Sequence, residues 1–462
     1  MCDYDCKQFH RWLNSYVKGD FIIMNEGFMN GLLSFAGKMQ SNKVLSAIKD
    51  AFVDNMPVVI MGAFCTLFQF ILSATAAQGY QISLANVPGF GWLAGLWDMW
   101  GMMNYGCMNF MAVAIVFLVS MHYAENLGHA GDKTAPAVAL ASFVSLINTS
   151  ITYTPEGATE AVSVGSGVLN TYTNAQGLFV ALIVGILATL IYVKLIQSGK
   201  LTLKLPDSVP PNVAHSFSVL FPAVVTILCF GLLGFVMDKV FHSSFFTLIA
   251  TIMAPVQAIM TGLPGYLVIV LIMMLLWWFG IHGPNVMGAV TTPFMTAAYA
   301  ANNAAFAAGE PLPNIICTPF GSAFFSHTGS GITGGLIIAI LLFSKRDDFK
   351  AIARLAIPCG IFNINEPIIF GIPMVMNPLL GIPFFLAPVV SVTIGYLLTA
   401  IGICPRFGVD APWTTPTGIL GFLASGGNIM GGLSQLIAFA SSILVYTPFV
   451  IVANKQVSEA AA

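Results

Sequence analysis

The chain has 462 residues, of which 57% are hydrophobic and only 8% are charged, and its formal net charge is −2. Soluble globular proteins carry about 25% charged residues, so this composition excludes an ordinary soluble protein and indicates a polytopic membrane protein. The near-neutral charge balance does not point to a nucleic-acid partner.

Lysines and arginines are concentrated in a few segments. Six lie in residues 1–50, three in 194–204 and four in 345–354. Cytoplasmic loops of membrane proteins are enriched in these residues, so we place the three clusters in the cytoplasm and the loops near 75–100 and 154–176 outside. The protein is thus expected to be a multi-pass membrane protein with both termini in the cytoplasm.

In the first half, residues 1–50 mix charges with apolar residues at helical spacing, which favours amphipathic helices in the cytoplasm or at the interface. Stretches long enough to cross a core of ~30 Å then follow. These predicted spans are residues 51–74, 101–122, 134–153, 177–197 and 215–237. A charged, proline-broken cytoplasmic loop covers residues 200–211, and residues 240–263 are predicted to form an outer-surface helix that connects the halves.

The second half is less regular, and its predicted spans are residues 264–281, 285–305, 331–344, 381–403 and 430–453. Residues 314–329 are too short to cross, and residues 355–379 would begin and end on the cytoplasmic side. We interpret both as re-entrant hairpins, because irregular backbone at membrane depth must be buried in protein. The predicted fold is all-α, with ten transmembrane helices and two hairpins of opposite entry, an arrangement with which transporters build midplane sites.

One carboxylate lies within the second predicted hairpin. Glu366 stands between Asn365 and Pro367, and Asn363 precedes them. An acid inside the membrane costs a few kcal/mol or more, so it usually faces a cavity and has a function. Pro367 disfavours helical backbone at residue 366 and predicts a break there. A carboxylate with two amides suits a polyhydroxylated ligand, although a buried acid paired with a neighbour is the structural alternative.

Three further polar segments lie in the second half. An aromatic-rich helix end closes on His282, which suits a sugar because aromatic faces stack on sugar rings and imidazole binds hydroxyls, but helix-end capping beside an interfacial aromatic belt fits as well. Residues 324–331 include His327 and form either part of a site or only a hairpin tip. Residues 410–418 include Trp413 and either close a site or form an outside loop.

Metal and nucleotide sites are not expected. Eight cysteines are scattered along the chain, and Cys65, Cys107, Cys229 and Cys359 lie inside apolar segments, where they behave as small hydrophobic residues. The sequence lacks phosphate-binding loops, nucleotide fingerprints, zinc-ligand patterns and nucleophile elbows. We therefore expect no cofactor and no metal.

An ordered set of short motifs resembles one family. In chain order the motifs are Leu205-Pro-Asp-Ser-Val-Pro210, Phe279-Gly-Ile-His-Gly283, Gly329-Ser-Gly331, Asn363-Ile-Asn-Glu-Pro-Ile-Ile-Phe-Gly371, Met376-Asn-Pro378, Ala411-Pro-Trp-Thr-Thr-Pro-Thr-Gly418 and Val452-Ala-Asn-Lys455. Together they resemble the membrane IIC component of the bacterial phosphoenolpyruvate-dependent sugar phosphotransferase system, in its lactose/cellobiose/N,N′-diacetylchitobiose family. The resemblance runs from about residue 28 to residue 456.

The resemblance implies a homodimeric permease. Its domains would be an amphipathic segment (1–50), a five-helix dimerisation domain (51–240), a sugar-binding transport domain with both hairpins (241–455) and a cytoplasmic tail (456–462). A separate cytoplasmic IIB subunit carrying a phosphocysteine would phosphorylate the 6-hydroxyl of the transported sugar. Whether the chain is itself an enzyme is left open, because it would be the membrane subunit of a phosphotransferase and carry no phosphorylated residue.

The resemblance also assigns residues. His282 and Glu366 match the positions that bind the sugar near the hydroxyl to be phosphorylated, and Trp277 and Trp413 match aromatic positions near the sugar. With the polar residues above, the expected substrate-binding set is Trp277, His282, Gly283, His327, Asn363, Asn365, Glu366 and Trp413. A carboxylate can take the hydroxyl proton as phosphorus is attacked while histidine steadies the oxygen, so Glu366 and His282 are the expected catalytic pair. Which of them is the base stays open.

The sequence departs from the family pattern in two places. The first 25 or so residues, with Cys2 and Cys6, extend beyond the usual start, and His327 and Thr328 replace less polar residues before Gly-Ser-Gly. Only seven residues follow Lys455, so we expect IIB to be a separate protein.

The expected sugar is a β-linked disaccharide of the cellobiose, chitobiose or lactose type. The competing hypothesis is a proton-coupled secondary sugar transporter in which Glu366 carries the proton.

Overall fold

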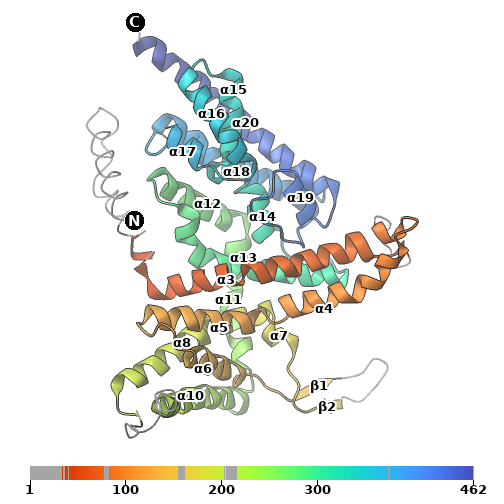
Figure 1. Cartoon of the computed structure of the whole chain (residues 1–462), viewed down its shortest axis with the longest axis vertical. Coiled ribbons are helices and arrows are strands. Elements are labelled where there is room, and N and C mark those ends of the chain that lie inside the picture. The colour runs from red at the N-terminus through yellow and green to blue at the C-terminus, as the bar shows by residue number, and fades with distance from the viewer. Residues whose placement is uncertain are drawn as a thin grey trace. The chain divides into compact units, whose positions relative to one another are not determined.

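A computed structural model describes residues 34, 37–39, 41–76, 83–153, 162–201, 203, 216–372 and 374–460. The chain divides into two compact units, Met1–Asn42 and Lys43–Ala462. Most of the predicted segment 1–50, with Cys2 and Cys6, and most of the loop 200–211 lie outside the described residues. The architecture that follows is that of Lys43–Ala462 (Figure 1).

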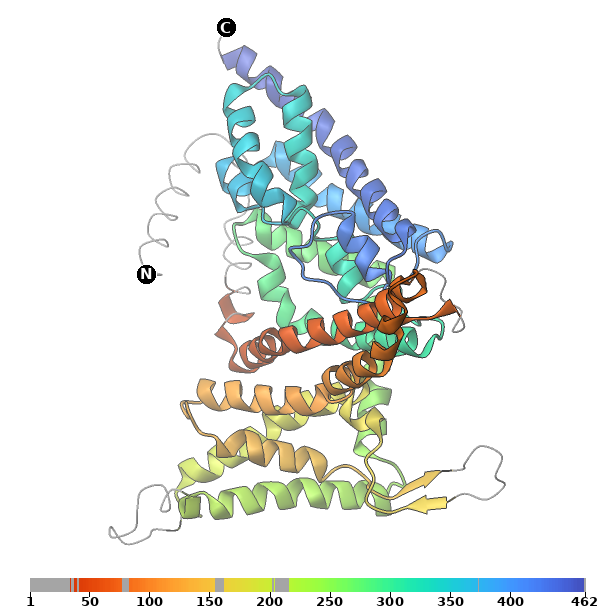
Figure 2. The ribbon, with the colours of Figure 1, turned by 45° about the vertical axis from the view of Figure 1, so that its right-hand side comes forward.

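The first half of this unit is a set of packed helices (Figure 2). In chain order they are α3 (Lys43–Phe68) with the π-helical turn η1 (Gln69–Ser73), η3 (Leu84–Asn86), η4 (Gly91–Leu96), α4 (Trp97–Met108), α5 (Met111–Asn126), α6 (Thr134–Val144), α7 (Asn170–Thr173), η5 (Ala175–Gly177), α8 (Leu178–Ser198) and α10 (Leu220–Lys239). The hydroxyls of Ser120 on α5 and Thr189 on α8 lie 2.5 Å apart in a buried hydrogen bond. Gly185 lets the same two helices approach closely, since a Cβ there would lie 3.1 Å from Val119. Small residues and buried hydroxyls are the usual contacts between membrane helices.

The predicted span at 134–153 is shorter than expected. Its helix α6 has 11 residues and ends at Val144. The polar run 148–150 favours a turn, and the next residues form strand β1 (Ile151–Tyr153), which pairs antiparallel with β2 (Val162–Val164). The hydropathy of the sequence does not separate this helix from this strand, so both fall within one predicted span.

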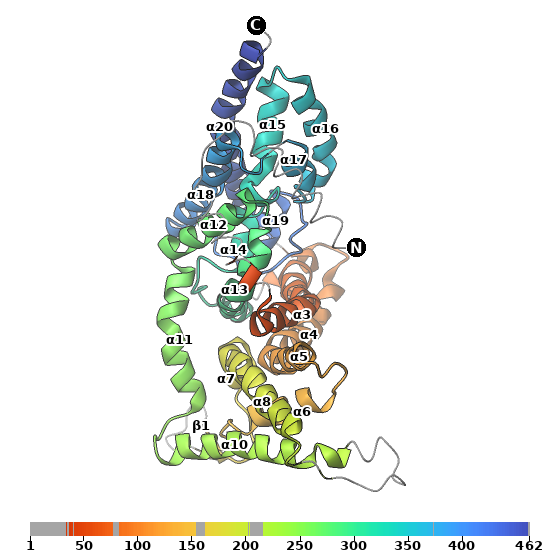
Figure 3. The same cartoon turned by 90° about the vertical axis from the view of Figure 1, so that its left-hand side faces the viewer.

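The connector predicted at 240–263 is helix α11 (Phe245–Thr261), which meets α12 (Leu263–Trp278) at a bend of 69°. The hydroxyl of Ser244 caps α11 by accepting from the N–H of Thr247 at 3.0 Å. Gly262 is extended between the helices, and a proline follows in the first turn of α12, so one helix ends where the next begins. Figure 3 shows α11 running between α10 and α12 and so joining the two halves.

The second half contains α13 (Gly283–Ala308), α14 (Thr318–Phe324), η6 (Ser330–Ile332), α15 (Thr333–Phe343), α16 (Asp347–Ile361), α17 (Glu366–Gly371), α18 (Pro378–Ala400), α19 (Ile419–Ala424) and α20 (Ile429–Ala460). Both α15 and α18 pack against α20. The hydroxyl of Tyr446 on α20 donates to the carbonyl of Gly331 at 2.7 Å. Gly335 brings α15 onto α20, because a Cβ there would lie 2.8 Å from the backbone of Ser442.

Six helical segments among the described residues are long and apolar enough to cross a bilayer: Lys43–Ser73, Gly91–Asn126, Ala175–Ser198, Leu220–Lys239, Pro378–Ala400 and Ile429–Asn454. The bent pair α11–α12 makes a seventh. On α10 the side chains of Leu228, Leu232 and Phe235, which are 60–64% exposed, form an apolar stripe suited to lipid. The chain is therefore a mostly helical multi-pass membrane protein, with fewer full-length spans by this criterion than the ten predicted.

Candidate functional site

The backbone break predicted at Glu366 occurs just before it. Helix α16 ends in a Schellman turn, in which the N–H of Ile364 bonds to the carbonyl of Cys359 at 3.0 Å and Asn363 has a left-handed φ of +66°. Asparagine tolerates this conformation better than most other residues. Helix α17 then begins at Glu366, with Pro367 in the first turn, where a missing N–H costs little. Glu366 thus stands at the tip between α16 and α17.

Asn363 joins three segments. Its Oδ1 accepts from the N–H of Thr328 at 2.6 Å, and its Nδ2 donates to the carbonyls of Trp413 and Thr415 at 2.5 and 2.9 Å. Both amide donors are thereby used inside the protein. This arrangement indicates that Asn363 positions the loops around Glu366, and the predicted contact with substrate would require one of these bonds to open.

Asn365 holds the facing turn. Its Nδ2 donates to the carbonyl of Ser330 at 2.6 Å, and its side chain packs over Gly329, where no Cβ would fit. Thr328 and Ile332 both have left-handed φ, +55° and +51°, although β-branched residues rarely adopt it. Strained backbone that is held by surrounding contacts is typical of functional sites.

His327 lies within the same turn but is fully buried. Its ring packs edge-on against Phe439, with 6.0 Å between the ring centroids. Among the described residues neither ring nitrogen has a partner of hydrogen-bond geometry, although the ring interacts with the backbone of Ala323. The structure does not bring His327 into the lining of either cavity described below.

A second part of the predicted site forms where α13 begins. The Nδ1 atom of His282 accepts from the N–H of Asn285 at 3.2 Å, so His282 is the N-cap of α13 and its Nε2 is left for another partner. The indole of Trp277 packs on the imidazole, with 4.6 Å between ring centroids. Gly283 lies directly against the backbone of Met273, where a Cβ would overlap the carbonyl, so close packing requires a glycine there, and its contact with substrate stays a prediction.

Glu366 and His282 lie within electrostatic range of each other. The carboxylate of Glu366 interacts electrostatically with His282, the carboxylate is exposed, and the imidazole is partly buried. A carboxylate accepts hydrogen bonds from hydroxyl groups, and the free imidazole nitrogen can donate or accept. Glu366 and His282 thus lie within electrostatic range of each other at two helix ends that are distant in sequence, and their catalytic role stays a prediction.

A small cavity of about 120 Å³ lies beside Trp413, between α3, α13, α14 and the loop before α19. Trp413 is 51% exposed, whereas Asp410 is buried and accepts from the N–H of Ala411 at 3.0 Å. Thr318 and Tyr299 also line the cavity, and the Thr318 hydroxyl has no partner among the described residues. Single hydroxyls in apolar helices carry no signal in the sequence, so the sequence could not show that Thr318 and Tyr299 line this cavity.

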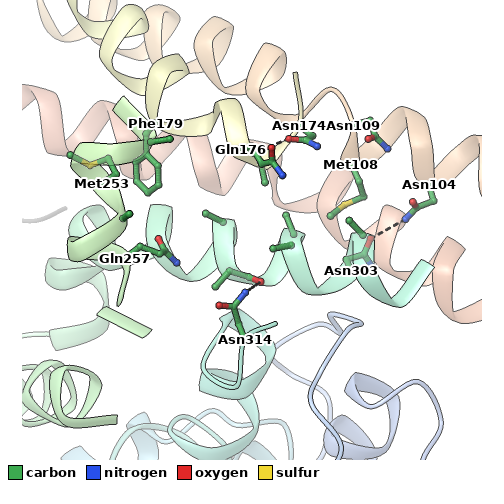
Figure 4. Close-up of a pocket in the computed structure, with 18 residues that line it drawn as sticks. Asn104, Met108, Asn109, Asn174, Gln176, Phe179, Met253, Gln257, Asn303 and Asn314 are labelled. Atoms are coloured by element: carbon green, nitrogen blue, oxygen red, sulfur yellow. Dashed lines mark hydrogen bonds between the residues drawn. The ribbon is translucent and has the colours of Figure 1, made fainter. Parts of the chain in front are cut away.

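A larger cavity of about 360 Å³ lies between α4, the start of α8, α11 and α13 (Figure 4). None of the residues of the predicted site lines it. Its polar side chains are carboxamides, which Figure 4 shows on α13 and on the segments around it. Within the described part of the chain, no group of three or more His, Cys, Asp and Glu side chains could hold a metal.

Long apolar helices and broken helix ends that carry polar residues are typical of membrane transport proteins. A family model described as "Phosphotransferase system, EIIC" matches residues 49–388. The chain therefore belongs to the EIIC family of phosphotransferase-system permeases, which confirms the family that the motifs predicted.

Individual relatives match over nearly the whole chain. The cellobiose-specific EIIC component of Geobacillus stearothermophilus is 35% identical over 92% of this chain and 93% of its own length. The putative permease IIC component YwbA of Bacillus subtilis (strain 168) is 34% identical over 90% of this chain and 92% of its own. The crystal structure of ChbC, the IIC component of the N,N′-diacetylchitobiose-specific system, matches with a TM-score of 0.84 at 32% identity and covers 93% of this chain and 98% of that one.

Proposed function

We propose that the protein takes up a β-linked disaccharide of the cellobiose or diacetylchitobiose type and presents it for phosphorylation inside the cell. Similar proteins are described as cellobiose-specific, oligo-beta-mannoside-specific and lichenan permease components, which supports this class of sugar. The observation that carries the proposal is the match to EIIC permeases over nearly the whole chain. Glu366 and His282, which lie at two helix ends within electrostatic range of each other, are the residues to which the proposal assigns the sugar.

In this proposal the pair acts on one hydroxyl group. The sugar 6-oxygen attacks the phosphorus of a phosphocysteine on a IIB protein, the sulfur–phosphorus bond breaks, and the thiolate leaves. The hydroxyl proton passes to a base at the site, for which Glu366 is suited, while Nε2 of His282 holds the same oxygen. The half-exposed indole of Trp413 offers a face on which a sugar ring can stack.

Helix α16 leads into the hairpin that carries Glu366, and it begins within a basic cluster, residues 345–354. Arg346 donates to Asp348 at 2.5 Å, and this hydrogen bond lowers the pKa of the Asp348 carboxyl. The Arg346 guanidinium also lies 3.7 Å above the ring of Phe349. Excess positive charge at the start of this hairpin supports a cytoplasmic position, from which an anionic phosphoryl carrier can approach.

The finer topology belongs to the same proposal. The short helices α6 and α15 and the weakly hydrophobic α13 would complete ten crossings, with hairpins at about 314–329 and 355–379 and both termini in the cytoplasm. Residues 51–240 would form the dimer contact, and residues 241–455 would hold the sugar. Helices that are shielded by protein need not meet the length or hydropathy of isolated spans.

The decisive test is the chemical form of the sugar after uptake. Cells that contain the protein, its IIB partner and phosphoenolpyruvate should accumulate sugar phosphate only, and deletion of IIB should abolish uptake. Accumulation of unmodified sugar that an uncoupler prevents, in cells without the phosphorelay, would instead establish the proton-coupled mechanism with Glu366 as carrier.

A further inference from the structure

The larger cavity shown in Figure 4 has an unusual chemical lining. Seven carboxamide side chains contribute to it, among them Asn104, Gln176, Gln257 and Asn314. The other lining residues are apolar, and none of the described residues around it is charged. A neutral, hydrogen-bonding lining offers no counter-charge to an ion or a phosphate and suits uncharged polyhydroxylated ligands.

Two of the carboxamides, those of Gln257 and Asn314, are held in place through their nitrogen ends. Gln257 donates through Nε2 to the carbonyl of Phe294 at 3.0 Å, whereas its buried Oε1 has no partner among the described residues. Asn314 donates through Nδ2 to the carbonyl of Ala298 at 3.1 Å. Groups that are fixed in this way lose little conformational entropy when a ligand binds.

Asn104 anchors the far end of the cavity. Its Nδ2 donates to the carbonyl of Gly62 at 2.8 Å and to the hydroxyl of Thr66 at 2.7 Å, and it contacts Oδ1 of Asn303 on α13 at 3.2 Å. Figure 4 shows this Asn104–Asn303 contact between α4 and α13. The cavity is thus bounded by helices of both halves of the chain.

The walls between the amides suit a sugar ring. The side chains of Phe179, Met108 and Met253 supply apolar surface, and alanines of α13 also line the cavity. Aromatic and apolar surface packs on the C–H faces of a pyranose while amides bind its hydroxyl rim. A volume of about 360 Å³ is at the lower end of the range for small-ligand sites.

We propose that this cavity is a second carbohydrate site, occupied by the neutral disaccharide before it reaches Glu366 and His282. The inference rests on the proposed function, and it adds a place where the sugar binds on its way to Glu366 and His282. The positive-inside assignment puts the loop before η5 outside and the opposite end of α8 inside, so the cavity beside η5 lies towards the outer end of α8.

The test uses a cysteine in the cavity and a matched cysteine beside it. Ala254→Cys lines the cavity on α11, and Ala258→Cys lies one turn further along α11 and does not line it; both alanines are exposed. Each is placed in full-length protein that also carries Glu366→Gln, which removes the carboxylate of the other site. Maleimide labelling of each cysteine is followed by mass spectrometry of the labelled peptide, with cellobiose or N,N′-diacetylchitobiose as the probe.

We expect the sugar that wild-type protein binds to slow labelling at residue 254 at least threefold and to leave labelling at 258 unchanged. Adding Gln257→Leu should raise the sugar concentration needed for protection at least threefold. Binding by the wild-type protein without protection at 254, or equal protection at 254 and 258, would overturn the second site alone. If wild-type protein binds neither sugar, the proposed function fails for these ligands and the second site fails with it.

Discussion

Glu366 and His282 are the residues on which sugar recognition should depend most. Both residues lie at helix ends within electrostatic range of each other, and a hydrogen bond from a sugar hydroxyl to a charged group contributes roughly 1.5–3 kcal/mol. We expect Glu366→Gln and His282→Ala each to weaken disaccharide binding by roughly 10- to 100-fold, without loss of membrane insertion. Equilibrium binding to purified protein and size-exclusion chromatography would measure the two properties.

Glu310→Gln provides a matched control, because Glu310 is an exposed acid in the turn after α13 and lines neither the small nor the large cavity. It should bind and transport sugar as the wild-type protein does. Normal uptake by both site variants would show that the pair does not contact the sugar.

The carboxamide of Asn363 should matter for stability rather than by contacting the sugar. Asn363→Gly keeps a backbone that tolerates φ of +66° but loses three hydrogen bonds, whereas Asn363→Ala loses the bonds and adds backbone strain. We expect both variants to lower the apparent melting temperature in detergent, and Ala more than Gly. If Asn363→Gly kept the wild-type melting temperature while its sugar affinity fell, the amide would be a ligand instead.

The residues of the candidate site differ in how far sequence could assign them. A carboxylate before proline in an apolar segment indicates function, because placing the charge inside the membrane costs free energy. Glu366 could therefore be identified from the sequence alone. The amide of Asn363 could not be assigned, because its partners Thr328, Trp413 and Thr415 come from other segments. His327 looked equally polar in the sequence, but the fold buries it.

The contact between α15 and α20 sets the position of the turn that faces Glu366. A Cβ at Gly335 would lie 2.8 Å from the backbone of Ser442, and backbone cannot move aside as a flexible side chain can. We expect Gly335→Ala to destabilise the protein by roughly 1–3 kcal/mol, which should appear as a lower apparent melting temperature.

Gly231→Ala is the control on another helix. Nothing lies within 4 Å of a Cβ at Gly231, which is in the interior of α10, so alanine should be neutral or slightly stabilising. Equal losses for both substitutions would show that the α15–α20 contact has no special sensitivity to added volume.

At the level of elements, long apolar segments were the easiest to predict. Helices α3, α8, α10, α18 and α20 all overlap predicted spans. The predicted end of the span at 134–153 was wrong. The β-branched residues at 151–153 raise the hydropathy as much as the residues of a membrane helix do, and only their pairing with residues 162–164 reveals a strand. A break at Glu366 was predicted from Pro367, because proline acts through local backbone geometry, and the break lies just before that residue.

The proposed orientation of the whole molecule predicts which surfaces a membrane-impermeant reagent can reach. A cysteine at Ser163, on strand β2, should be labelled by maleimide in intact cells, and a cysteine at Lys350, near the start of α16, only after permeabilisation. A control cysteine at Leu228, on the apolar stripe of α10, should react slowly in both cases because lipid covers it. Labelling of residue 350 in intact cells would invert the topology.

Helix α11 limits how the two halves of the chain can be displaced. With 17 residues it measures about 25 Å from end to end. As long as α11 stays helical, the beginning of α12 stays at this distance from the beginning of α11. It can therefore move only along an arc centred on the beginning of α11. If a bound sugar moves along the membrane normal with the second half of the chain, the beginning of α12 must then also move parallel to the membrane plane. Such a movement would displace lipid beside α11.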